Sequence, residues 1–106
     1  MKNEMTTIDL KVNHYFAAGV YAREMQLQKG HYADSHKHKF SHLSILASGI
    51  ALVEVEGIEK IFYAPAVIEI KAGLIHKITA LEDVFWYCIH ASEETDVSKI
   101  DKVLII

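Results

Sequence analysis

The sequence predicts an all-β domain, either a sandwich or a barrel, and three observations lead to that expectation. Short segments in which apolar and polar residues alternate recur along the chain. Glycine or short polar turns separate these segments. β-branched and aromatic residues are frequent within them, as is typical of strands. Many short strands at regular spacing with glycine turns indicate a β-sandwich or β-barrel.

The expected elements follow one another with short connections. A first short strand is predicted at residues 7–12, and residues 14–19 are predicted to connect it to the next. Residues 20–28 alternate strictly, which predicts a half-buried strand with one face formed by Tyr21, Arg23, Met25 and Leu27. Residues 31–39 are polar and extended. Further strands are predicted at 42–47, 50–56, 59–63, 66–70, 75–80 and 84–90. Residues 92–101 are predicted to be a loop with at most one short helical turn, before an apolar tail at 103–106.

Length and composition exclude several classes of protein. A chain of 106 residues forms one domain, which we place at 1–106, with its core at about 20–90 and a C-terminal tail at 92–106. The chain is 51% hydrophobic and carries a net charge of −3, so neither disorder nor a nucleic-acid partner is expected. No apolar run approaches the roughly 20 residues of a membrane span. The single cysteine, Cys88, and the absence of an apolar stretch among the first residues lead us to expect a cytoplasmic protein.

Three closely spaced histidines and a fourth further along predict a metal site. His36, His38 and His42 have the spacing H-x-H-x3-H, and His76 follows in a later segment. Residues two apart on a strand share a face, so His36 and His38 can bind one ion. His38 and His42 would lie about 13 Å apart on one straight strand. That is too far for bonds of about 2.0–2.1 Å. The chain must therefore turn or bulge between them, which would place His42 on a neighbouring strand.

Other interpretations of these residues stay open. A helix would join His38 and His42 at i and i+4, but it would turn His36 away. The four histidines could also be surface or core residues without a metal. His31 and His90 are either structural residues or part of a pocket, and with Tyr32 they are the available candidates for a general base. Three aromatic residues could line a substrate pocket, but in a small barrel such side chains are more often in the core: Tyr32, Trp86 and Tyr87. Cys88 is expected to be a small core hydrophobe.

The spacing of the first histidine cluster resembles the first motif of the cupin superfamily, G-x5-H-x-H-x3/4-E-x6-G. The matching positions are Gly30, His36, His38, His42 and Gly49. His42 stands where the motif usually has glutamate. The second motif is also similar, with Pro65, Gly73 and His76 in place, whereas Ala66 replaces a glycine and Thr79 or Ala80 replaces an asparagine. The resemblance covers residues 20 to 90, most of the chain.

This resemblance implies a double-stranded β-helix, or jelly-roll barrel, with a metal at one end. The implied ligands are His36, His38, His42 and His76, and the implied cofactor is a divalent transition metal such as Mn, Fe, Ni, Zn or Cu. Four neutral imidazoles leave the ion with its full +2 charge, which favours an anionic ligand and acidifies bound water. Such a protein would be a metal-dependent dioxygenase, or a related enzyme, acting on a small anionic or enol-type substrate. The alternative is a non-catalytic module that binds a metal or a small ligand.

The sequence also leads us to expect a homodimer. Residues 103–106 are four consecutive aliphatic side chains at the end of the chain. Exposed apolar surface of that kind costs about 25 cal/mol per Å² in water. The predicted strand at 8–12 and this tail could pair with a second copy, and a twofold arrangement is the commonest closed form. The tail could instead fold onto its own barrel.

Overall fold

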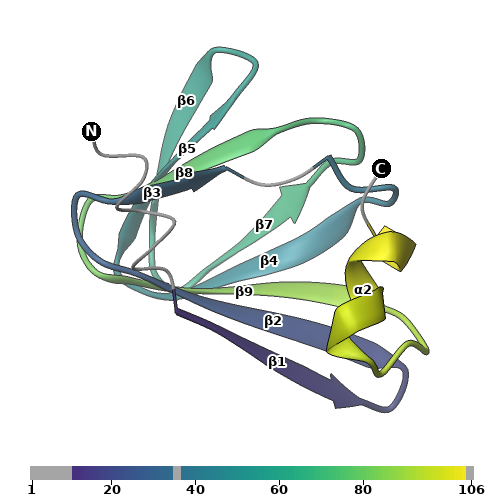
Figure 1. Cartoon of the computed structure of the whole chain (residues 1–106). Coiled ribbons are helices and arrows are strands. Elements are labelled where there is room, and N and C mark those ends of the chain that lie inside the picture. The colour runs from purple at the N-terminus through teal and green to yellow at the C-terminus, as the bar shows by residue number, and fades with distance from the viewer. Residues whose placement is uncertain (1–10, 35–36, 105–106) are drawn as a thin grey trace.

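The computed structural model describes residues 11–34 and 37–104, which form two antiparallel β-sheets facing each other and one helix (Figure 1). The first sheet has five strands in the order β1-β2-β9-β4-β7. Its strands are β1 (Lys11–Ala17), β2 (Val20–Leu27), β9 (Val84–Ala91), β4 (His42–Ser48) and β7 (Ala66–Ile70). The second sheet has four, in the order β3-β8-β5-β6. They are β3 (Tyr32–Asp34), β8 (His76–Ala80), β5 (Ile50–Val55) and β6 (Ile58–Tyr63).

The space between the sheets holds the apolar core, as the alternation in the sequence predicts. Inward side chains from both sheets are almost inaccessible to solvent, and they surround Trp86. The core residues are Leu27, Leu46, Ala51, Val53, Ile68, Ile70, Ile78, Ala80, Val84 and Trp86. The packing of these side chains confirms the expectation that Trp86 is a core residue. The same expectation is wrong for Tyr87, the next residue on β9, which points to the outer face of the sheet and whose hydroxyl donates a hydrogen bond of 2.5 Å to Glu24.

Gly49 fixes the turn between β4 and β5, where the chain passes from one sheet to the other. Its φ of +94° is one that L residues with side chains rarely adopt. A Cβ atom there would also lie 2.0 Å from the backbone oxygen of Asp83. Any other residue would therefore have to move this turn away from the β8–β9 connection. The glycine that ends the first sequence motif thus has a structural requirement of its own.

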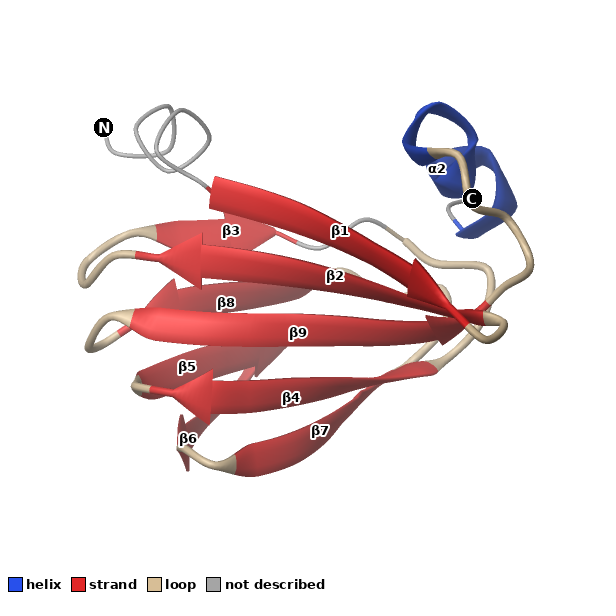
Figure 2. Cartoon of the chain, turned by 90° about the horizontal axis from the view of Figure 1, so that it is seen from below, coloured by secondary structure: helices blue, strands red, loops and turns tan. Residues whose placement is uncertain are grey.

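Most of the predicted strands are confirmed, but the first part of the chain differs. Residues 14–17, expected to be a connection, belong to β1, which pairs with β2 along its whole length from Lys11–Gln26 to Ala17–Val20. The reason is that this pairing covers the edge of β2. The predicted strand at 7–12 lies mostly outside the described residues. Figure 2 shows β1 at one edge of the five-stranded sheet, next to β2 and then β9.

The C-terminal region is also more ordered than expected. Residues 92–96 form a loop as predicted, but helix α2 (Val97–Leu104) takes the second half of the predicted loop, so the limit of one short helical turn was wrong. Asp96 caps it, because its carboxylate accepts a hydrogen bond of 2.9 Å from the Ser98 amide. Ile100 and Leu104, four residues apart on one helix face, are buried against Tyr21. Among the described residues, no helix is long and apolar enough to span a membrane.

The packing of α2 changes the argument for a dimer. Leu104 belongs to the tail that was expected to seek a second copy, yet only 4% of its surface is exposed, because it packs on its own barrel. The alternative in which the tail folds onto its own chain is therefore confirmed for Leu104, while residues 105–106 lie outside the described part. The homodimer itself stays a prediction, and it no longer has Leu104 as its support.

Candidate metal centre

His38 lies in the loop between β3 and β4, and two backbone hydrogen bonds hold that loop in place. The carbonyl of His38 accepts a bond of 3.0 Å from the Gly73 amide, and the amide of Lys39 donates one of 2.6 Å to the carbonyl of Leu104. The chain bends at residues 39–40 before β4 begins at His42. This bend confirms the turn that the spacing of His38 and His42 requires, and it excludes the helical alternative.

His42 and His90 come from neighbouring strands of the five-stranded sheet. Leu43 on β4 pairs with Ile89 on β9, so His42 and His90 are each one residue beyond that pair and on the inner face. Their ring centroids are 4.0 Å apart. The ring of His38 lies 4.7 Å from that of His42 and 5.3 Å from that of His90.

The three histidines form a compact, buried group that could hold a metal ion. One nitrogen from each of His38, His42 and His90 lies within 4.8 Å of the other two. In a tetrahedral site with bonds of about 2.1 Å, ligand nitrogens are about 3.4 Å apart, so modest ring rotations would close this group on one ion. No side chain among the described residues hydrogen-bonds either ring nitrogen of His42, and only the backbone of Phe40 offers it a hydrogen bond. Buried imidazoles in this state are suited to a divalent transition metal.

The surroundings of the group keep its imidazoles neutral, which is the form that binds a metal. The pKa of His42 is lowered to about 3, mainly by burial and in smaller part by repulsion from His90, His38 and His76. Burial likewise lowers the pKa of His90 to about 4, with added repulsion from His38 and Arg23. Protons therefore compete little with a metal for these nitrogens at neutral pH.

The four predicted ligands are not all brought together. His38 and His42 belong to the compact group. His36 lies outside the described residues. His76 begins β8, is buried, and lies near enough to His42 to lower its pKa, but it is not part of the group. It lines a separate cleft of about 490 Å³ between β5, β6 and β7. The structure thus supports three histidines, and the site of four stays a prediction.

The sequence treated His90 as a structural or pocket residue, whereas the structure makes it a member of the group. The alternation along residues 84–90 could have placed His90 on the inner face of its strand. Only the register between β4 and β9 reveals that His90 lies beside His42. Tyr21 stacks on His90 at a centroid distance of 5.9 Å. The hydroxyl of Tyr21 is also 2.7 Å from Nδ1 of His14. His14, which gave no signal in the sequence, therefore supports the site through Tyr21.

Two of the predicted general bases lie elsewhere. Tyr32 begins β3 in the four-stranded sheet, and His31 is the residue before it. Neither is part of the histidine group. The ammonium of Lys77 lies 4.2 Å from the centroid of the Tyr32 ring. Cys88 is partly buried and packs against the core, as expected, and burial raises the pKa of its thiol. Cys88 is thus an unreactive interior side chain at neutral pH.

These features define an all-β barrel with a buried group of histidines, and solved structures identify the fold. A cupin 2 conserved barrel domain protein from Salinispora arenicola is 18% identical over 90% of this chain and 82% of its own, with a TM-score of 0.68. A cupin superfamily protein from Desulfitobacterium hafniense is 13% identical over 80% and 79%, with a TM-score of 0.69. The chain has the cupin barrel fold that its two motifs predict.

A third similar structure is the cupin_2 domain of an XRE family transcriptional regulator from Enterobacter cloacae. It is 14% identical over 76% of this chain and 93% of that domain, with a TM-score of 0.65. At these identities the similarity establishes the fold and not the activity. No family model and no curated protein matches the sequence.

Proposed function

We propose that this chain is a metal-binding cupin in which His38, His42 and His90 hold one divalent transition metal. The observation that supports it best is His42, which is buried and whose ring nitrogens have no side-chain hydrogen-bond partner among the described residues. Burying such polar atoms without partners costs about 1–3 kcal/mol, and a metal bond would offset that cost. All-imidazole sites accept ions from Mn to Zn, so the chemistry of the donors leaves the metal's identity open.

The proposed activity is a metal-dependent oxygenase or related reaction on a small anionic or enol-type substrate. When bound, the metal would act as a Lewis acid or activate dioxygen. The chain itself would hold the three imidazoles neutral and oriented, with Tyr21 stacked on His90 and tied to His14. The apolar core around Trp86 would exclude water from the inner side of the site.

Metal content after loading and dialysis tests the proposal. Elemental analysis of the wild-type protein should give about one ion per chain, and His42→Ala should lose most of it. His31→Ala is the matched control, because it removes an imidazole outside the group, and it should keep the metal. A wild-type protein that retains no metal, or equal metal in all three proteins, would refute the proposal.

A non-catalytic binding module is the second candidate, and one observation favours it. The compact group contains no carboxylate, so the described residues place no Asp or Glu there as a general base. A similar barrel is a domain of a transcriptional regulator, which fits a ligand-sensing role. Oxygen consumption by the metal-loaded protein with β-diketones, catechols and thiols distinguishes the two, because a sensor would bind without turnover.

A further inference from the structure

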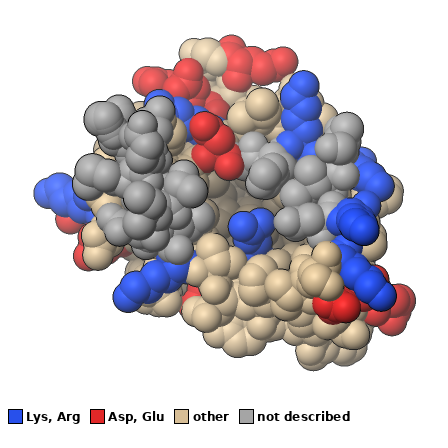
Figure 3. Space-filling model, viewed as in Figure 1, with Lys and Arg blue, Asp and Glu red and all other residues tan. Residues whose placement is uncertain are grey.

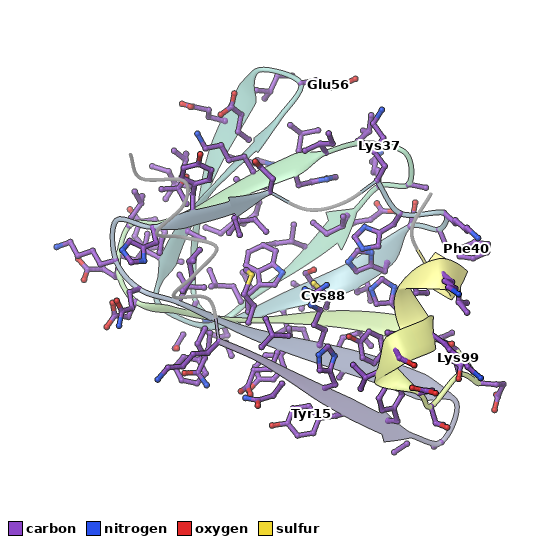
Figure 4. The ribbon with its side chains drawn as sticks, in the orientation of Figure 1. Tyr15, Lys37, Phe40, Glu56, Cys88 and Lys99 are labelled. Atoms are coloured by element: carbon purple, nitrogen blue, oxygen red, sulfur yellow. The ribbon has the colours of Figure 1, made fainter. Side chains whose placement is uncertain are left out.

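An arginine faces the interior of the barrel beside the histidine group. Arg23 lies on β2 between Tyr21 and Met25 in the alternation, and both of these neighbours point inward, toward buried clusters. Its cross-strand neighbours are His14 on β1 and Cys88 on β9. Figure 4 shows Cys88, labelled, in the space between the two sheets. The strand pairing therefore places Arg23 on the inner face of the five-stranded sheet, where Cys88 also lies.

Arg23 is close enough to the histidines for its charge to act on them. Tyr21 pairs with His90, so Arg23 is diagonal to His90, a separation of about 7–8 Å that a long side chain can span. Its positive charge is one of the causes that lower the pKa of His90, after burial and His38. The space-filling view shows Lys and Arg side chains both at the rim and nearer the middle of this face (Figure 3).

No carboxylate of the described residues neutralises Arg23. The one ion pair within the described ranges joins Lys29 to Glu82, at the far end of β2. Glu24, its neighbour in sequence, points to the outer face, where Asn13 and Tyr87 hold it. An arginine side chain stays positively charged in proteins, and a partly buried charge without a counter-ion is unfavourable. A divalent ion on three neutral imidazoles would add two more positive charges nearby.

We propose that Arg23 binds the carboxylate of a small ligand whose other donor atom reaches the metal held by His38, His42 and His90. The planar guanidinium matches a carboxylate with two parallel hydrogen bonds. On the described inner faces of β1, β2, β9 and β4, Arg23 is the single Lys or Arg. One such charge matches a monocarboxylate better than a phosphate dianion. This inference rests on the proposed metal site and names the ligand class that the site selects.

Isothermal titration calorimetry on cobalt(II)-loaded protein tests it with the hydroxy acids lactate and glycolate, each compared with its neutral amide. At least one acid should bind the wild-type protein about 10–100-fold more tightly than its amide, the range of one charge-assisted contact. Arg23→Gln should remove that preference, and Arg23→Lys should restore part of it. Lys99→Gln, which removes the same charge from the exposed side of α2 (Figure 4), should behave as wild type.

The outcomes separate this inference from the proposed function. Cobalt stoichiometry is measured first, and a wild-type protein that binds no cobalt overturns both. A protein that binds cobalt but prefers none of the acids to its amide overturns the role of Arg23 alone, whatever the variants do. Equal preference in wild type and Arg23→Gln also overturns it. If Arg23→Gln does not fold, Arg23→Lys decides: unchanged affinity for the preferred acid refutes the two-bond geometry, and a loss supports it.

Discussion

At the scale of single residues, His42 is the side chain whose surroundings make most sense with a bound ion. Burial, and not one specific neighbour, is the largest cause of its low pKa. An apolar residue at the start of β4 would fill the same space without leaving a buried ring nitrogen unpaired. His42 is also the position where the cupin motif usually has glutamate, so the substitution keeps a metal-binding donor and removes a negative charge.

The choice between His90 and His76 as a ligand is a prediction at this scale. We expect His90→Ala to lower the affinity for zinc or cobalt by more than about tenfold, since losing a ligand should cost at least as much as losing a second-sphere partner. His76→Ala should stay within a few-fold of wild type, because His76 is outside the compact group. Competition against a coloured chelator measures both affinities. The opposite order would favour the site formed by His36, His38, His42 and His76.

Sequence spacing could predict part of this site and not the rest. His38 and His42 are four residues apart, so the geometry of the chain between them was enough to require a bend. His90 is 48 positions beyond His42 in the sequence, and their contact depends on which strands pair and in which register. Register is decided by side-chain packing across the whole sheet, which no local pattern reports.

At the scale of elements, α2 and the loop that carries His38 form one unit. Besides the bond between the Lys39 amide and Leu104, the ammonium of Lys39 donates a hydrogen bond of 2.9 Å to the carbonyl of Lys102. A cation beside the last carbonyls of a helix is favourable, since these carry partial negative charge. The end of the helix is thus bonded to the residue after His38, even though the two are distant in sequence.

Leu104→Ala should therefore affect both stability and metal binding. Removing a buried leucine side chain costs about 2–5 kcal/mol, measured by urea unfolding at neutral pH. The alanine keeps the backbone carbonyl that bonds Lys39, but the loss of packing should let the end of α2 shift and move this carbonyl, so we also expect weaker cobalt binding. Val103→Ala is the control, since Val103 is exposed, and surface changes usually stay within about 0.5 kcal/mol. A destabilised Leu104→Ala protein with wild-type cobalt affinity under folding conditions would show that helix and loop are independent.

The elements that the sequence missed share a physical reason. Residues 97–104 contain three β-branched residues and several charges, so their local preference for a helix is weak. The burial of Ile100 and Leu104 against Tyr21 stabilises the helix, and this contact is tertiary. Residues 14–17 became strand for a similar reason, because pairing with β2 determines them. For strands with strong alternation and glycine boundaries, such as β4 and β5, the local sequence pattern was enough to predict the strand.

At the scale of the whole molecule, the barrel has an apolar core and a polar group of histidines near α2. Trp86 and its neighbours occupy the interior toward one side, while His38, His42 and His90 occupy the other. Apolar burial supplies most of the stability of such a domain. Protonation of the buried histidines lowers this stability, because a charged imidazole is unfavourable in the interior. The stability of the metal-free protein should therefore depend on pH.

The metal-free protein should lose stability as the pH falls below about 6.5. Unfolded histidines take up protons near pH 6.5, whereas the folded protein holds the pKa of His42 at about 3 and that of His90 at about 4. Between these values the unfolded chain binds more protons, so acid favours unfolding by up to about 1.4 kcal/mol per pH unit for each histidine. Urea unfolding of chelator-treated protein at pH 6.5, 5.5 and 4.5 measures the slope. The series of pH values ends at 4.5 because Glu24 would add a second effect at lower pH. Hydrogen bonds from Tyr87 and Asn13 lower the pKa of Glu24, and the stability that Glu24 contributes is lost only below about pH 4.5. His42→Leu should reduce the slope by the share of one histidine, and a free energy of unfolding that is constant over this range would contradict the burial of neutral imidazoles.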